Sequence, residues 1–399
     1  MTLLSLVTLN SSLLASALLA PSGPVPATST SYAQDKPQEF TFVRPTRAAM
    51  GIVVKETHDL TMLSLSTQLG ENPPVVTGGT STGMRTRVDA SIAEEIVDVG
   101  AEVNGLRRRY LALEGKVQLV DISSVNTENQ TFEGLGLELR SPLEGLSVVF
   151  QPAASQPDGF GRHFDGVALR EAALPSLSAP SDWSRLLPPA PKDSDAVMIT
   201  LGDSWALDPA LLEPLIAPTG ALGWRRRKDE GKKAQDPTSD AQVLRAFASG
   251  VGGNLHLAFD GEVTGEANAK LVTVGVDPDH GRYGEVSISF ALEFAADRQE
   301  FLNSRRLGGE GELDVDVVGG DLSVRLNGQA TIKWGLDLGR PFAALTVAEE
   351  EVSMTVSIRP PSGELASQTI VMKGALQNGL SFRERPLAPV KRTVVEQGK

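Results

Sequence analysis

The stretch VSISFALEF, residues 286–294, alternates large apolar side chains with small or polar ones. Successive side chains of a β-strand point to opposite faces of the sheet, so this stretch buries one face and leaves the other in water. The same period of two recurs at 322–326, 330–338 and 352–358. We therefore expect an antiparallel meander of about seven or eight strands in the C-terminal part of the chain.

Glycine, asparagine and proline mark the turns expected in this meander. Gly319-Gly320 separates two alternating stretches. Asn327-Gly328 is a strong hairpin signal, because both residue types tolerate positive φ. Asp277-Pro278 also lies between two alternating stretches, where a hairpin turn belongs.

The N-terminal half carries a weaker β pattern. Strands are expected at 40–43, 51–55, 60–65, 117–122, 135–139 and 146–150. Residues 92–113 fit either a helix or a strand–turn–strand unit, and the turn-like Asn104-Gly105 favours the second interpretation. A proline-rich stretch follows, in which Asp208-Pro209 is expected to start a short helix and Ser239 to cap another.

These patterns predict a mainly β fold with two antiparallel β-sheet domains, sandwich or half-barrel-like in form. The expected segments are a signal peptide at 1–33, an N-terminal β domain at 34–182, a proline-rich linker with short helices at 183–250, a C-terminal β domain at 251–385, and a tail at 386–399.

Residues 1–34 contain no charged side chain, and 3–20 are mainly apolar. Small residues fit cleavage after Ala17 or Ala33, so we expect a secretory signal and a periplasmic or extracellular protein. The leader lacks the usual Lys or Arg near its start. An interrupted transmembrane helix is the alternative, which the polar stretch 10–12 disfavours. No transmembrane span is expected in the mature chain.

The chain has a net charge of −13 and no cysteine. The acidic field disfavours binding to nucleic acid. The lack of thiols excludes disulfides, cysteine nucleophiles and cysteine zinc sites. Hydrophobic residues make up 41% and aromatic residues only 5%, so the core must be mostly aliphatic.

Other side chains give no firm prediction of a site. His58, His163 and His256 are expected at the surface, and no histidine pair has the spacing of metal ligands. Asp314 and Asp316 share one strand face and could bind calcium, but a solvated charged face is the favoured interpretation. We therefore expect neither a metal site nor a cofactor.

Residues 197–205, VMITLGDSW, run from an apolar strand into Gly-Asp-Ser. This block resembles the first motif of the GDSL-type serine hydrolases. The resemblance implies Ser204 as nucleophile, His280 as base and Asp277 as its orienting carboxylate, because 277–280 matches Asp-x-x-His. The stretch between the motifs lacks the alternating strands and helices of that family, so a protein with no catalytic residue is favoured.

Several short blocks together resemble an uncharacterised family of exported bacterial β proteins with no established activity. The blocks are 108–110 (RRY), 141–145 (SPLEG), 187–189 (LPP) and 202–205 (GDSW). This resemblance implies that Ser204 is a turn residue before a packed Trp205. It also implies a layout similar to envelope lipid carriers, in which a curved sheet holds an acyl chain.

Three hypotheses for the function follow. The first is a non-catalytic envelope protein that binds an apolar ligand or a protein partner on a concave β face. The second is an esterase that uses Ser204 and His280. The third is a structural surface protein without a cavity.

Overall fold

The computed structural model describes residues 38–41, 50–78, 82–98, 104–121, 136–141, 143–154, 160–165, 182–191, 196–219, 225–226, 262–297, 316–359 and 363–384. Within these ranges nearly all regular structure is β-strand, and the mainly β prediction is confirmed. None of the helices described there is long and apolar enough to cross a membrane.

The strands are β1 Gln38–Thr41, β2 Met50–Leu69, β3 Val75–Gly78, β4 Thr82–Asp98, β5 Asn104–Asp121, β6 Gly136–Arg140, β7 Ser147–Pro152, β8 Phe160–Phe164, β9 Ala196–Ile199, β10 Ser204–Leu207, β11 Arg225–Arg226, β12 Glu262–Asp277, β13 Gly281–Asp297, β14 Asp316–Gly335, β15 Arg340–Arg359 and β16 Ala366–Glu384. The helical elements are the 3-10 turns η3 Trp183–Leu186 and η4 Pro209–Leu212 and the helix α1 Glu213–Ile216.

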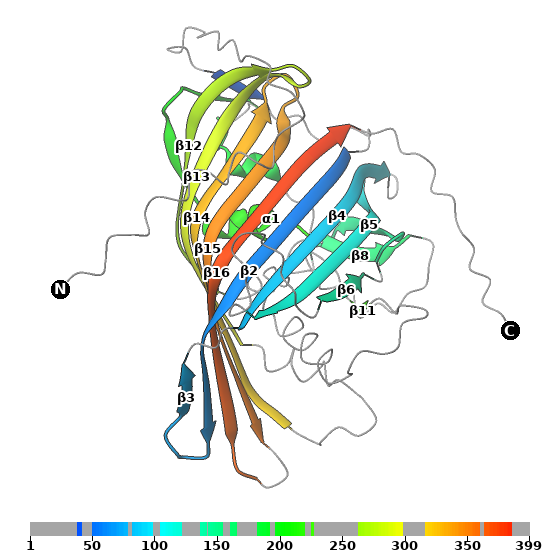
Figure 1. Cartoon of the computed structure of the whole chain (residues 1–399). Coiled ribbons are helices and arrows are strands. Elements are labelled where there is room, and N and C mark those ends of the chain that lie inside the picture. The colour runs from blue at the N-terminus through cyan, green and yellow to red at the C-terminus, as the bar shows by residue number, and fades with distance from the viewer. Residues whose placement is uncertain are drawn as a thin grey trace, which may run out of the picture. The chain divides into compact units, whose positions relative to one another are not determined.

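One antiparallel sheet of 14 strands dominates the structure (Figure 1). Its order is β10-β12-β13-β14-β15-β16-β2-β4-β5-β6-β11, with β3, β7 and β8 added beside this path and β1 and β9 forming a separate pair. β2 pairs with β16 from Met50 opposite Glu384 to Leu69 opposite Ala366. The expectation of two separate β domains is not confirmed, because this pairing joins strands of both halves into one sheet.

Two of the expected turns are wrong. Gly319-Gly320 and Asn327-Gly328 both lie inside the 20-residue strand β14. A Cβ at Gly328 would lie 2.4 Å from the carbonyl oxygen of Val347 on β15, so glycine is needed there for close strand approach. The turn at Asp277-Pro278 is confirmed, because β12 ends at Asp277 and β13 begins at Gly281.

The described parts of 92–113 form two paired strands, as the favoured interpretation predicted, because β4 runs to Asp98 and β5 begins at Asn104. The expected turn at Asn104-Gly105 is wrong, because both residues lie in β5, opposite Asp98 and Val97. The short helix expected at Asp208-Pro209 is also present. The Asp208 carboxylate accepts a hydrogen bond of 3.0 Å from the Ala210 amide, and Pro209 occupies the first turn.

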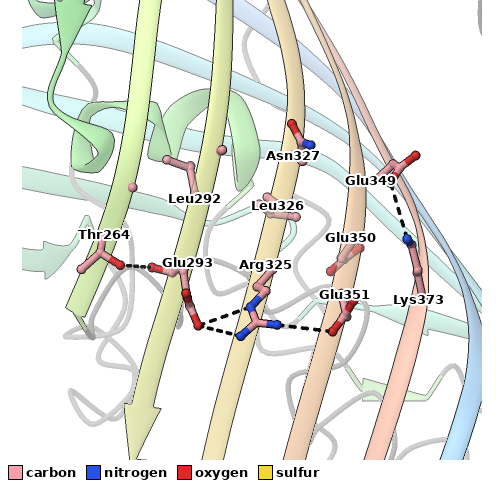
Figure 2. Close-up of a pocket in the computed structure, with 12 residues that line it drawn as sticks. Thr264, Leu292, Glu293, Arg325, Leu326, Asn327, Glu349, Glu350, Glu351 and Lys373 are labelled. Carbon is pink, nitrogen blue, oxygen red and sulfur yellow. Dashed lines mark hydrogen bonds and ion pairs between the residues drawn. The ribbon is translucent and has the colours of Figure 1, made fainter.

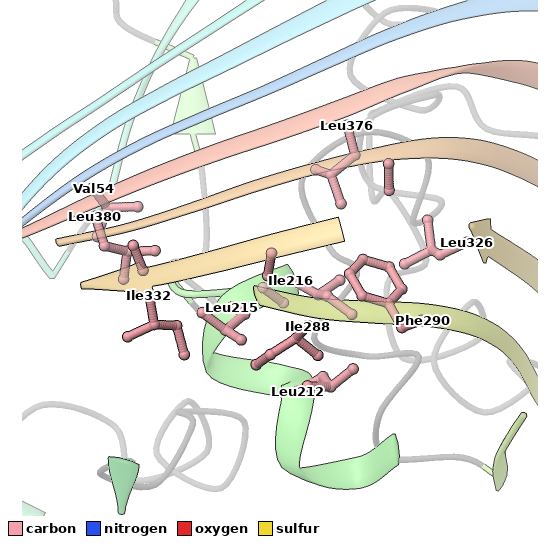
Figure 3. Packing of buried hydrophobic residues seen from close by; sticks show 14 of the residues in the cluster. Val54, Leu212, Leu215, Ile216, Ile288, Phe290, Leu326, Ile332, Leu376 and Leu380 are labelled. Carbon is pink, nitrogen blue, oxygen red and sulfur yellow. The ribbon is translucent and has the colours of Figure 1, made fainter. Parts of the chain in front are cut away.

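One face of the sheet, here called the inner face, carries the hydrophobic core. It presents apolar side chains from successive strands, including Ile288, Leu326, Leu376 and Val54. The segment formed by η4 and α1 packs against this face, with Leu212, Leu215 and Ile216 fully buried (Figure 3). The proline-rich stretch thus supplies part of the core itself. The opposite face of the sheet is called the outer face.

Several expectations fall outside the described residues. They concern the signal peptide at 1–33, the helix expected from Ser239, His256, Asp314 and the tail at 386–399.

Candidate functional site

The structure brings two of the three hydrolase candidates together. Nδ1 of His280 lies 2.8 Å from Oδ1 of Asp277 in the turn between β12 and β13. Desolvation raises the pKa of the Asp277 carboxyl group, but the hydrogen bonds from the His280 side chain and from the amides of Asp279 and His280 together outweigh it and lower this pKa. The His280 ring also stacks on Phe342, with centroids 4.2 Å apart.

Ser204 is placed elsewhere. It pairs with Lys270 of β12, seven positions before Asp277 in the sequence. At about 3.3 Å per strand residue, Ser204 and Asp277 lie about 23 Å apart along the sheet, far beyond hydrogen-bonding reach. Trp205 donates from Nε1 to the Leu186 carbonyl oxygen at 3.1 Å, which fits the role of a packed tryptophan after a turn.

The most unusual chemistry lies on the inner face of the sheet, where charged residues are fully buried. His58 on β2 stands between two carboxylates: its Nδ1 is 2.9 Å from Oε2 of Glu350 on β15, and its Nε2 is 3.0 Å from Oε1 of Glu56. The exposed fractions are 1% for His58, 2% for Glu56 and 0% for Glu350. The expectation that His58 lies at the surface is therefore wrong.

Burial and charge pull the pKa of His58 in opposite directions. Desolvation lowers it, whereas the charge of Glu350 and hydrogen bonds to Glu350 and Glu56 raise it. Together, the attractive interactions with Glu350 and Glu56 outweigh desolvation and raise the pKa of His58 to about 10, so the imidazole is protonated at neutral pH.

Further polar side chains extend this cluster across β15, β16, β2 and β4. Thr346 is opposite Asn378 and Asn378 is opposite Glu56, while Thr86 is opposite His58. We define the buried polar patch by its members on the inner face, which are Glu56, His58, Thr86, Thr346, Glu350 and Asn378.

The patch holds the η4–α1 segment on the sheet. Oγ1 of Thr219 donates to Oε2 of Glu56 at 3.0 Å. Nδ2 of Asn378 donates to the carbonyl oxygens of Leu215, at 3.1 Å, and of Ile216. These bonds satisfy carbonyls at the end of a four-residue helix that would otherwise be buried without partners.

A second feature is the uncharged extension of the sheet, defined as residues 62–69 of β2, 75–78 of β3, 352–358 of β15 and 366–372 of β16. It contains no Asp, Glu, Lys, Arg or His, in a chain that is 22% charged. Its strands are adjacent in the sheet, and β3 marks this end in Figure 1.

The two faces of the uncharged extension differ. The outer face carries hydroxyl groups that pair across strands, with Thr355 and Thr369 3.0 Å apart and Ser357 and Ser367 2.8 Å apart. The inner face carries mostly aliphatic and Met side chains, in the pairs Met354–Ile370, Ile370–Leu65 and Met372–Met62, and nearer the end of the sheet it carries the polar pair Gln368–Thr67. The extension is thus an amphipathic sheet.

Part of the inner face of this extension is exposed. Met62, Val356 and Ile370 are only partly buried where they adjoin the core. Leu69 is 56% exposed and Val75 71% exposed at the end of the same face. An apolar surface therefore runs from the row of Leu65 and Ile370 into the core, and the pair Gln368–Thr67 separates it from Leu69 at the end of the sheet.

A belt of ion pairs crosses the outer face where the extension begins (Figure 2). Arg325 lies 3.3 Å from Glu293 and 3.7 Å from Glu351, and Lys373 lies 3.6 Å from Glu349. These groups line a shallow groove of about 350 Å³. Because the cations and carboxylates pair with one another in an exposed setting, each pair contributes little to stability, and the groove presents no strong excess of charge.

Glu349, Glu350 and Glu351 are consecutive on β15, and the strand period places them on different faces of the sheet. Glu349 and Glu351 belong to the outer belt, whereas Glu350 points inward to His58. Among the residues that the structure describes, no group of three His, Asp or Glu side chains is arranged to hold a metal ion.

No protein-family model matches this chain, and no curated protein matches it either. Several solved structures show weak similarity, and two of them are described here. An outer membrane channel from Pseudomonas putida F1 is 11% identical, with 86% of this chain and 97% of that one covered and a TM-score of 0.17. The InvG secretin-domain β-barrel from the Salmonella SPI-1 injectisome is 8% identical, with 86% and 65% covered and a TM-score of 0.14. These scores are too low to carry an argument on fold or function.

Proposed function

We propose that this chain is an exported, non-catalytic envelope protein that binds an apolar ligand with a flexible aliphatic chain. The binding surface is the inner face of the uncharged extension, around Leu65, Met354, Val356 and Ile370. The single observation that carries the proposal is the apolar surface that stays partly exposed there and continues into the core. Contiguous exposed apolar surface of this kind is typical of interaction sites.

The composition of the surface favours an aliphatic chain over an aromatic or charged ligand. Its side chains are Leu, Ile, Val and Met, and the unbranched Met62, Met354 and Met372 can adapt to a flexible chain. The deeper part of the inner face is filled by Leu212, Leu215 and Ile216 of the chain itself. The ligand would therefore enter from the extension rather than fill the whole concave face.

The competing functions lack comparable support. The esterase would need Ser204 near His280, and the two lie on different parts of the sheet. A purely structural surface protein gives no reason for an apolar inner face left partly open. The exported location is inferred from the uncharged, mainly apolar stretch at the start of the sequence.

Native mass spectrometry tests the proposal, with dodecanol added to the purified protein. We expect a one-to-one adduct that Val356→Asp on the inner face abolishes. Ser353→Asp places the same charge on the outer face of the same strand and is expected to leave the adduct intact. Equal uptake by both variants, or no uptake by the wild type, would contradict the proposed function.

A further inference from the structure

Exposed apolar side chains gather at the free end of the uncharged extension, around β3 (Figure 1). They belong to Leu69, Val75, Val76 and Leu365, which together define the tip. The two connecting segments of the tip are in contact, because the Gly70 amide donates to the carbonyl oxygen of Leu365 at 2.7 Å. The four side chains therefore lie together at one end of the sheet, and a gathering of this kind is typical of an interaction site.

The tip presents apolar side chains on both faces of the sheet. Leu69 and Val75 lie on the inner face, whereas Val76, opposite Ser66, lies on the outer face. A protein partner that packs against a sheet covers one of its faces, whereas the fluid interface of a lipid bilayer surrounds both. The tip therefore fits a lipid surface better than it fits a folded protein.

The charges beside the tip limit the kind of lipid surface. Glu71 and Glu364 lie in the two connecting segments and are exposed, whereas the cation Arg359 at the end of β15 is opposite Asp316. The whole chain also carries a net charge of −13. An anionic bilayer would repel these carboxylates, whereas a zwitterionic phospholipid offers them the ammonium group of its head group.

The proposed ligand surface begins a short distance from the tip. Leu65 and Leu69 are four positions apart on β2 and both face inward, so they lie about 13 Å apart along the strand. One polar row, Thr67 with Gln368, separates them. A bilayer that holds the tip would therefore bring a supply of aliphatic chains next to the ligand surface.

We propose that the tip inserts shallowly into a bilayer of zwitterionic phospholipid, and that the ligand of the inner face is an aliphatic chain taken from this bilayer. This inference rests on the proposed function and adds the source of the ligand. Insertion is shallow because the turns and the edge of a sheet present backbone polar groups, which the hydrocarbon interior does not tolerate. The carboxylates stay among the head groups, while the apolar side chains of the tip contact the upper part of the acyl chains.

Flotation with vesicles of dioleoylphosphatidylcholine tests the inference. We expect the wild type to float, and a smaller fraction to float when part of this lipid is replaced by anionic dioleoylphosphatidylglycerol. Val76→Asp places a charge at the tip and is expected to weaken vesicle binding at least about tenfold. Met198→Asp is the matched control, because Met198 on β9 is 59% exposed and Val76 is 62% exposed, and it is expected to float like the wild type.

Dodecanol uptake separates this inference from the proposed function. Val76 lies on the outer face, so Val76→Asp is expected to keep the dodecanol adduct, which also reports that the variant is folded. Dodecanol uptake by a wild type that does not float, or equal flotation of Val76→Asp and wild type, would overturn the inference and leave the proposed function standing. Flotation without dodecanol uptake would instead contradict the proposed function.

Two further outcomes would also overturn the inference. Stronger flotation with the anionic vesicles would show that the carboxylates beside the tip do not face the lipid, and this comparison decides even if Val76→Asp does not fold. A wild type that stays with the soluble fraction as a dimer, with Val76→Asp monomeric, would show that a second copy of the chain covers the tip.

Discussion

Nδ1 of His58 lies 2.9 Å from Oε2 of Glu350, although 292 positions separate the two residues in the sequence. The contact spans three strands, because β16 pairs with β2 on one side and with β15 on the other. The same imidazole contacts Glu56, two positions before it on β2. Long-range sheet pairing and a local period of two therefore both contribute to the buried charge cluster.

The first prediction concerns the loss of this imidazole. His58→Gln removes the only cation that contacts these two carboxylates in the described structure, and breaking a buried ion pair by removing one partner costs about 3–5 kcal/mol. We expect the urea midpoint to fall accordingly. His163→Gln changes an exposed histidine and is expected to alter the free energy of unfolding by less than about 0.5 kcal/mol. Similar losses of unfolding free energy in both variants would show that the ion pairs of His58 with Glu56 and Glu350 do not stabilise the fold.

The second prediction concerns pH. The pKa of His58 is about 10 in the folded protein and 6.5 as a model value. Between these values the folded state holds a proton that the unfolded state has released, so stability falls as pH rises. The contribution is fully present below pH 6.5 and is lost through pH 10, with a total on the order of 5 kcal/mol.

Urea unfolding of wild type and His58→Gln from pH 6 to pH 10 checks this sign. The difference in free energy of unfolding between the two proteins is expected to shrink steadily as pH rises. A difference that stays constant, or grows, across that range would show that His58 does not keep its proton in the folded state.

The strands could be predicted from the sequence because the inner face is apolar along most of its length. In β13 every second residue from Val286 to Phe294 is buried, and the alternation is plain. The order of the strands could not be predicted, since the pairing of β2 with β16 joins segments about three hundred residues apart. Such pairings depend on the whole chain and leave no local signal.

The sequence indicates one part of the buried polar patch, the residues on β2, and does not indicate their partner on β15. Val54, Glu56, His58 and Leu60 alternate along β2, so one face must carry both polar residues together with two apolar ones. This period-two signal could have placed His58 inside. Its partner Glu350 is the middle one of three consecutive glutamates, and such a run usually indicates a solvent-exposed segment. Only the alternation of side chains along the strand turns Glu350 inward to His58 and its two neighbours outward.

The third prediction concerns close strand approach at Gly374. A Cβ there would lie 1.8 Å from the carbonyl oxygen of Asp59 on β2, so Gly374→Ala must push two paired strands apart. Overpacking typically costs about 1–3 kcal/mol, and backbone displacement places this change at the upper end. Gly379→Ala on the same strand meets nothing within 4 Å and is expected to be neutral or slightly stabilising. Thermal denaturation of both variants measures the contrast, and equal melting temperatures would contradict the close approach.

The fourth prediction concerns the attachment of the η4–α1 segment. Asn378→Leu removes the donor to the carbonyl oxygens of Leu215 and Ile216 and leaves both buried without that partner, which costs about 2 kcal/mol. Because Leu215 and Ile216 are fully buried against the sheet, the loss should appear first as local opening of this segment.

Hydrogen exchange of the Ala217 amide, which donates to the Glu213 carbonyl oxygen at 2.7 Å, reports on that opening. We expect its exchange to accelerate at least about tenfold in Asn378→Leu, while amides in the middle of β14 change less. Asn268→Leu, at an exposed position of β12, is the matched control and should leave Ala217 protected. Acceleration confined to the sheet, with Ala217 unchanged, would mean that the buried apolar side chains alone hold the segment and that Asn378 has no part in its attachment.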